Sequence, residues 1–164
     1  MRIFKEEQRF MQLWLIVLLA VSTIVPVIMI IREYLHGKTS LLNLSWTLVL
    51  ILFATGFIFF FKLKTRIDEK GIHYQFFPFH LKSRLIKWNE IEKVYVRKYD
   101  PISEYGGWGL KGGALWNKGK GTAINVSGDI GIQLELKSGK KLLIGTQQEN
   151  NAKQVIKYYQ NLNS

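Results

Sequence analysis

One stretch of 23 residues, from Thr39 to Phe61, contains no charged side chain and leads directly into Lys62, Lys64 and Arg66. As a helix it would extend about 35 Å, which is enough to cross a hydrocarbon core about 30 Å thick with some tilt. Fourteen of its residues are Leu, Ile, Val or Phe, and together they favour insertion by roughly 6 kcal/mol. The stretch therefore predicts a membrane-spanning helix over residues 39–61.

A second uncharged run, from Leu13 to Ile31, is 19 residues long and is just long enough to span a bilayer. Pro26 removes one backbone hydrogen bond and predicts a kink there. A signal peptide is the competing interpretation, but the run is too long for its apolar region and no small-residue cleavage pattern follows. The polar residues 32–38, which include Gly37, should form an external turn between the two spans.

The N-terminal segment, residues 1–12, mixes basic, acidic and apolar side chains. Arg2, Lys5 and Arg9 alternate irregularly with two Glu residues and with Ile and Phe. We interpret this segment as a short interfacial helix that continues into the membrane. Its basic residues, together with those after Phe61, outnumber the two in the external turn, so the positive-inside rule places both termini in the cytoplasm, at the cell membrane.

Beyond Phe61 the hydrophobic pattern changes from helical to alternating, which predicts one β domain over residues 62–164. Short turns containing Gly separate the alternating runs, as expected of β-hairpins. About seven strands are expected, at or within residues 64–68, 72–77, 79–88, 92–99, 122–126, 130–137 and 140–144. Thr146 and Glu149 fit a capping box, and apolar residues follow at helical spacing, so an amphipathic helix should close the chain.

The chain contains the short motifs Tyr105–Gly109, Asn125–Gly128 and Ile144–Gln147, with Glu7, Gln8 and Trp14 near its start. Together these motifs resemble the bacterial PH-like (pleckstrin-homology-like) domains of small two-span membrane proteins. The resemblance implies an α+β membrane protein: a transmembrane hairpin, then an antiparallel PH-like barrel or sandwich of about seven strands capped by one C-terminal helix. It implies no activity. The phosphoinositide-binding members of the wider fold use clustered basic residues around the first hairpin, whereas residues 68–71 here hold two acids and one base.

The net charge of +11 favours an anionic partner. Beside a bilayer the simplest such partner is a lipid headgroup; nucleic acid is less favoured because the basic residues are scattered among acids. Docking of a protein partner on the domain, or self-association, is the alternative. The candidate surface for a lipid or protein partner comprises Lys62, Lys64, Arg66, Lys82, Arg84, Lys87, Trp108, Lys111, Trp116, Lys118 and Lys120.

The sequence carries no convincing catalytic, metal or cofactor motif. Residues 107–112 match G-x-G-x-x-G, but a dinucleotide site needs a helix after the motif, and further glycines and then a strand follow here. Trp108 beside these glycines is expected either to pack against the sheet or to enter an interface. There is no Cys, and His73 and His80 lack helical spacing. We therefore expect a non-catalytic binding or scaffold protein, or alternatively an accessory subunit that acts through its membrane helices.

Overall fold

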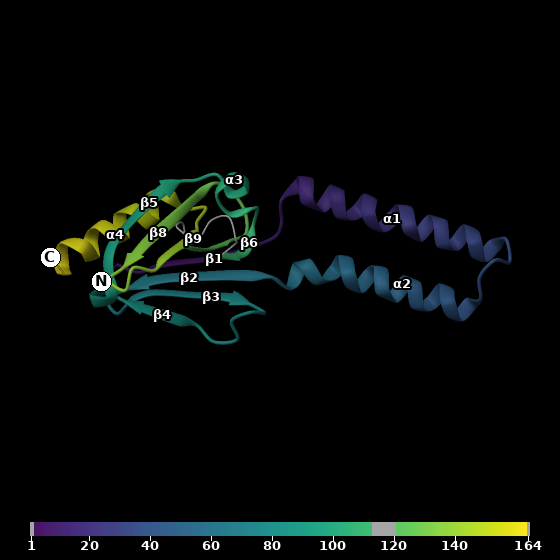
Figure 1. Ribbon diagram of the computed structural model, residues 1–164, viewed down its shortest axis with the longest axis horizontal. Coiled ribbons are helices and arrows are strands. Elements are labelled where there is room, and N and C mark those ends of the chain that lie inside the picture. Colours follow the sequence, from purple (N-terminus) through teal and green to yellow (C-terminus); the bar gives the residue numbers. More distant parts are fainter. Residues whose placement is uncertain (1, 113–120, 164) are drawn as a thin grey trace. The chain divides into compact units, whose positions relative to one another are not determined.

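The computed structural model describes residues 2–112 and 121–163, which form two compact units (Figure 1). One unit is helical and consists of residues 10–61. The other is a β domain built from residues 2–9 together with the described residues from 62 onward. The helical unit is therefore inserted in the sequence of the β domain rather than placed before it.

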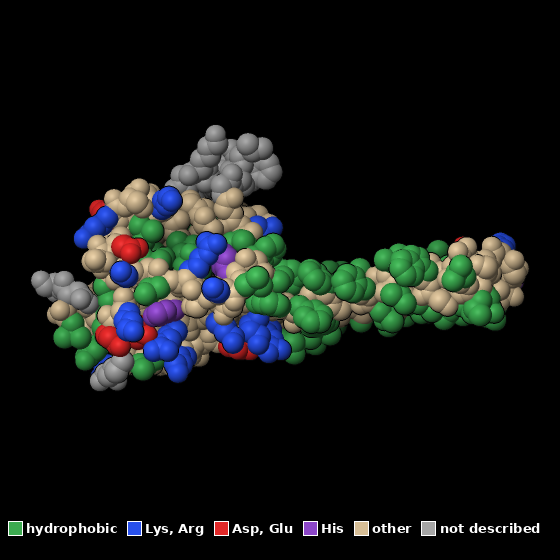
Figure 2. Space-filling view, turned by 90° about the horizontal axis from the view of Figure 1, so that it is seen from below, with side chains coloured by type: hydrophobic (Ala, Val, Ile, Leu, Met, Phe, Trp, Pro, Cys, Tyr) green, Lys and Arg blue, Asp and Glu red, His purple; other side chains and the backbone are tan. Residues whose placement is uncertain are grey.

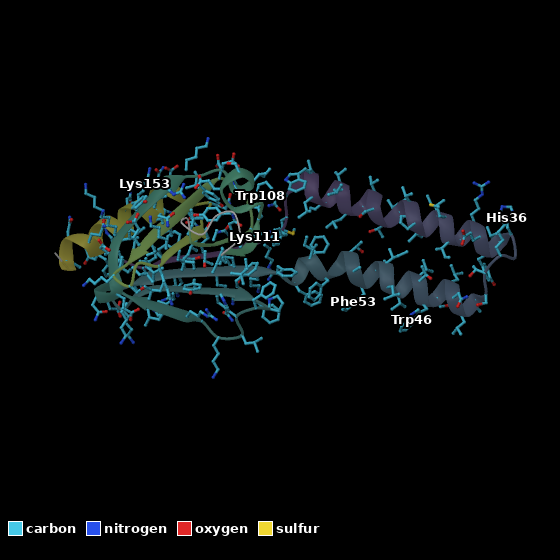
Figure 3. The ribbon with its side chains drawn as sticks, viewed as in Figure 1. His36, Trp46, Phe53, Trp108, Lys111 and Lys153 are labelled. Carbon is cyan, nitrogen blue, oxygen red and sulfur yellow. The ribbon has the colours of Figure 1, made fainter. Side chains whose placement is uncertain are left out.

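The helical unit contains α1 (Leu13–Leu35), α2 (Leu41–Gly56) and a short 3-10 helix, η1 (Phe57–Phe60). Ser40 caps α2 by accepting a hydrogen bond from the Asn43 N–H. Within the described residues, Leu13–Leu35 and Leu41–Phe60 are long and apolar enough to cross a membrane, by length and composition alone. Their side chains form an extended hydrophobic surface (Figure 2), and Trp46 and Phe53 point outward from α2 (Figure 3).

The first sheet is an antiparallel meander of β1 (Phe4–Arg9), β2 (Lys62–Asp68), β3 (Gly71–Phe77) and β4 (Arg84–Lys87). The helix expected within residues 1–12 is wrong, because most of that segment is strand β1. Glu6 and Gln8 occupy its inward positions, where an ordinary strand carries apolar residues. These two polar side chains hid the period of two from the sequence pattern.

The second sheet has the strand order β5-β8-β9-β7-β6. After η2 (Trp88–Glu90), its segments are β5 (Ile91–Lys98), helix α3 (Pro101–Tyr105), β6 (Gly109–Gly112), β7 (Thr122–Asn125), β8 (Ile130–Leu136) and β9 (Lys141–Gly145). Strands β7 and β9 are parallel, and the other pairs are antiparallel. The seven expected strands correspond to β2–β5 and β7–β9, whereas β1 and β6 were not expected. The two sheets do not form the closed barrel that was one of the expected forms.

The C-terminal helix is confirmed as α4 (Glu149–Asn163). It buries Ala152, Val155, Ile156 and Tyr159, which is the apolar stripe that its sequence predicts. The expected capping box is not formed, because the Thr146 hydroxyl accepts from the Gln148 N–H, before the first helical residue.

Two side chains of β1 connect the first sheet to the second. The Glu6 carboxylate accepts hydrogen bonds from the Thr146 hydroxyl, at 2.6 Å, and from the Gln147 N–H, at 2.7 Å. The Gln8 side-chain amide donates to the Gly145 carbonyl at 2.8 Å. Glu6 and Gln8 are both buried, so water cannot replace these hydrogen bonds if they are lost. The bonds therefore hold β1 in the domain.

Candidate functional site

The register of β1 and β2 determines which side chains share the outer face of the first sheet. Arg9 pairs with Lys62, and Lys5 pairs with Arg66. Side chains on directly paired residues point to the same face, and the alternate residues between them are buried. We call the outward cations of these two strands the basic face: Lys5, Arg9, Lys62, Lys64 and Arg66.

Like charges stand directly opposite each other on this face, at Lys5–Arg66 and at Arg9–Lys62. Such pairs destabilise a sheet unless an anion lies nearby. Glu7 supplies one anion, with its carboxylate 3.1 Å from Arg9, 3.1 Å from Lys62 and 3.7 Å from Lys64. Hydrogen bonds from Lys62 and then Arg9 lower the pKa of Glu7, so it stays ionised at neutral pH.

Asp68 supplies the second anion, at the far end of β2. Its buried carboxylate lies 2.8 Å from the Arg66 Nε and 3.1 Å from the His73 Nε2. Burial alone would raise the pKa of Asp68, but hydrogen bonds from the Lys70 N–H and from His73, with the Arg66 charge, lower it below its ordinary value. Five cations against two carboxylates leave the basic face with a formal charge of +3.

A cleft of about 610 Å³ opens on this face. Its lining combines residues of β1 and β2 with the outward side chains of β3 and a serine before β4: Lys5, Glu6, Glu7, Lys64, Thr65, Arg66, His73, Gln75 and Ser83. Figure 2 shows Lys and Arg gathered with acidic and His side chains on the surface of the β domain that it displays. A volume of this size accommodates a small polar ligand or a lipid headgroup, and the excess of donors favours an anionic one.

The other basic residues expected at the site lie on or before β4. Lys82 and Arg84 are exposed in and after the β3–β4 connection, and Lys87 is exposed at the end of β4. Lys87 pairs with Gly71, which places it on the outer face of the sheet but at the end remote from Lys62. Arg84 pairs with Tyr74, which pairs with buried Thr65, so the register places Arg84 on the other face of the sheet. The structure thus gathers Lys62, Lys64 and Arg66 on one face, and the β4 group does not join them as one surface.

Trp108 lies just before β6 and Lys111 lies on β6, so both belong to the region of the second sheet and do not join the basic face (Figure 3). The indole N–H of half-buried Trp108 donates to the Gly128 carbonyl at 3.0 Å, which links the turn before β6 to the turn before β8. Lys111 lies on β6, a strand at the edge of the sheet. Trp116, Lys118 and Lys120 lie outside the described residues.

The G-x-G-x-x-G match covers a turn and strand β6 rather than the strand-to-helix turn of a dinucleotide site. Nearby, the Asn125 side chain accepts from the Gly109 N–H and donates to the Tyr99 hydroxyl at 2.7 Å. Burial raises the pKa of Tyr99 to about 12, so this hydroxyl stays protonated. The arrangement is a hydrogen-bonded core beside the glycines.

The three histidines do not come together in the described part of the chain. His36 lies between α1 and α2, whereas His73 bonds Asp68 and His80 lies in the β3–β4 connection. Glu104 forms a two-bond ion pair with Arg97. Among the described residues, no group of three or more His, Asp or Glu side chains is arranged to hold a metal ion.

Sequence reasoning missed Lys5, Arg9 and His73 as members of the charged surface. The first two were assigned to a helix, where they would not align with Lys62 and Arg66. The usable signal was the exposed alternation of Lys5, Glu7 and Arg9, which matches that of Lys62, Lys64 and Arg66.

Comparison of the sequence with protein-family models and with curated proteins yields no match in either case.

Proposed function

We propose that this chain is a membrane-anchored, non-catalytic binding protein whose β domain contacts anionic lipid headgroups at the cytoplasmic surface of the cell membrane. In this proposal α1 and α2 cross the bilayer, and the basic face binds the phosphate groups. The observation that carries the proposal is the cleft on the basic face, lined by cations in adjacent rows and left with a net positive charge.

The pairing of β1 with β2 supports a two-span topology. Arg9 and Lys62 are neighbours in one sheet, so the chain that leaves the domain at Arg9 must return to the same side of any membrane it crosses. Two crossings satisfy this requirement. The positive-inside rule then assigns that side to the cytoplasm, because Lys and Arg flank both ends of the helical unit.

A PH-like assignment is part of the proposal and draws support from the topology. Strands β1–β4 form one meander, β5, β8 and β9 form a second, and α4 follows. Taken this way, α3, β6 and β7 are an insertion between β5 and β8. These seven strands and a C-terminal helix agree in number with what the resemblance implies, although the seven strands expected from the sequence included β7 and not β1.

The test uses the full-length protein in phosphatidylcholine vesicles that contain a trace of spin-labelled phosphatidylglycerol or spin-labelled phosphatidylcholine. Electron paramagnetic resonance measures the fraction of each labelled lipid that the protein immobilises. We expect the protein to prefer phosphatidylglycerol, and added salt to weaken that preference. Each basic residue near the headgroups contributes about 1 kcal/mol, so Lys5→Gln with Lys64→Gln should reduce the preference by about tenfold or more.

Lys153→Gln with Lys157→Gln is the matched control, because it removes the same charge from exposed positions of α4 (Lys153 is labelled in Figure 3). The proposal fails if the two double variants lose the preference equally, which would indicate a response to net charge alone. It also fails if the wild-type protein shows no preference at low salt.

A further inference from the structure

The connection between β3 and β4, residues 78–83, exposes large apolar side chains. Phe79 is 58% exposed and Leu81 is 77% exposed, and Phe77, which ends β3, is 38% exposed. Two exposed cations, Lys82 and Arg84, follow directly. Apolar side chains beside Lys and Arg are the combination that binds the interface of an anionic bilayer.

The fold itself holds this connection in place. The Gln75 side-chain amide donates to the carbonyls of His80, at 3.2 Å, and Leu81, at 2.9 Å. The His80 N–H donates to the Phe76 carbonyl at 2.7 Å, and the buried His80 ring accepts from the Phe76 N–H. The backbone that carries Phe79 and Leu81 is therefore pinned to β3, and their exposure is built into the domain.

The strand register places this connection at one particular end of the first sheet. Phe77 pairs with Lys62, and Lys62 pairs with Arg9. Arg9 and Lys62 are also the residues at which the chain leaves and re-enters the β domain on either side of residues 10–61. The β2–β3 turn at Glu69 lies at the opposite end of the sheet (Figure 1), about 20 Å away along a seven-residue strand.

We propose that the β3–β4 connection is a membrane-inserting loop, in which Phe79 and Leu81 enter the interfacial layer of a phospholipid bilayer while Lys82 and Arg84 meet headgroup phosphates. The proposal rests on the proposed function insofar as α1 and α2 bring this end of the sheet to the membrane. It adds a contact of a different kind, since the basic face binds by charge and the loop binds by burying apolar side chains. The two contacts together would restrict how the domain is oriented on the bilayer.

The chain contains no Cys, so a single introduced Cys can carry an environment-sensitive dye at a chosen position. The full-length variants Leu81→Cys, Phe79→Cys and Glu69→Cys would each be labelled and reconstituted in vesicles of phosphatidylcholine and phosphatidylglycerol. Glu69 is the control because it is exposed and lies in a turn of the same sheet, at the other end. Replacing Leu81 removes little packing, because most of that side chain is exposed.

We expect the emission of dyes at Leu81 and Phe79 to shift to shorter wavelengths. Lipids that carry a nitroxide near the headgroup should quench these two dyes several-fold more than they quench the dye at Glu69. Lys82→Gln with Arg84→Gln should reduce that quenching in anionic vesicles and leave it unchanged in neutral ones. The inference is overturned if dyes at Leu81 and Phe79 have the same emission wavelength as the dye at Glu69 and aqueous iodide quenches all three equally. A dye that is shielded from iodide but not quenched by the nitroxide lipid would also overturn it, because a protein would then cover the loop.

Extraction of the vesicles with alkaline carbonate separates this inference from the proposed anchoring. Protein that stays in the membrane but shows water-exposed dyes refutes the loop and keeps the anchor. Protein that is extracted refutes the anchor, and the nitroxide quenching measured before extraction still decides whether the loop inserts.

Discussion

Strand β1 should be indispensable to the β domain although some 50 residues separate it from the rest of the domain. Two shortened chains without residues 10–61 test this. One contains residues 62–164 alone, and the other also keeps β1 by joining Arg9 to Lys62 through Asn-Gly. The joined chain keeps β1, because Arg9 and Lys62 are paired neighbours and Asn-Gly forms the tight turn of a two-residue hairpin.

The contacts of β1 set the size of the expected difference. Burial of Phe4 contributes about 2 kcal/mol, and the two hydrogen bonds to the buried Glu6 carboxylate contribute about 2 kcal/mol each. The Gln8 bond to Gly145 adds about 1 kcal/mol. Pairing with β2 roughly offsets the entropy of ordering the strand, so losing β1 should cost at least about 5 kcal/mol, which is comparable to the whole stability of many domains.

Thermal unfolding followed by circular dichroism measures the difference. We expect the joined chain to unfold cooperatively, and residues 62–164 alone either to show no cooperative transition or to unfold about 20 °C lower or more. Glu6→Ala in the joined chain should give an intermediate loss, because it removes only the carboxylate bonds. If residues 62–164 alone unfold within a few degrees of the joined chain, β1 is not part of the domain core and the reasoning is refuted.

Three further predictions concern single side chains of the β domain. Burial, and then the charge of Arg84, lower the pKa of His80, so the folded state binds fewer protons than an unfolded chain whose His pKa is near 6.5. The contribution of His80 to stability should be fully present above that pH and should decline as the pH falls below it. His80→Gln should flatten that decline between pH 7.5 and 5.5, as measured by thermal unfolding. Gly71→Ala should lower the free energy of unfolding in denaturant by more than about 2 kcal/mol, because the φ of +145° at Gly71 disfavours a side chain and the added Cβ would collide with the Ile86 carbonyl. Gly139→Ala is the control: Gly139 has φ +79° and open space around it, so the loss should be about 1 kcal/mol. Glu104→Gln should lower the free energy of unfolding by about 2 kcal/mol in the same assay, because it removes the charge from a half-buried ion pair that makes two hydrogen bonds with Arg97. Glu149→Gln is the control: it breaks an exposed ion pair with Lys153 and should lower the free energy of unfolding by less than about 0.5 kcal/mol.

The elements that the sequence predicted well are those whose hydrophobic pattern is local. Leu13–Ile31 and Thr39–Phe61 are uncharged and mostly apolar, and the structure has α1, α2 and η1 there. Helix α1 continues to Leu35, into the expected external turn, and α2 ends at Gly56, where η1 follows. Strand β2 alternates between exposed Lys64 and Arg66 and buried Leu63 and Ile67. In α4 the buried residues recur at helical spacing. In β2 and α4 one buried face produces the pattern, and the pattern is visible without knowing what covers that face.

The elements that the sequence did not predict depend on contacts between distant residues. The inward positions of β1 hold Glu6 and Gln8, whose partners are about 140 residues away. Nothing local indicates that these side chains are buried, so the segment resembled an interfacial helix. The basic face was only half predicted for the same reason, because Lys5 and Arg9 join Lys62 and Arg66 only through strand pairing. Strand β6 is short and contains two glycines, which are unfavourable in strands.

Because the helical unit lies between two paired strands, any crossing of a bilayer by α1 and α2 would constrain the folding of the β domain. Strand β1 is synthesised first and must remain unpaired until Lys62 emerges, after residues 10–61. If both helices cross the bilayer, as proposed, β1 and β2 are returned to the same side and can pair. If only one crossed, Arg9 and Lys62 would be on opposite sides of the membrane, and the Glu6 contacts with Thr146 and Gln147 could not form. A folded β domain in the membrane form would therefore itself report that the helices had crossed the bilayer an even number of times.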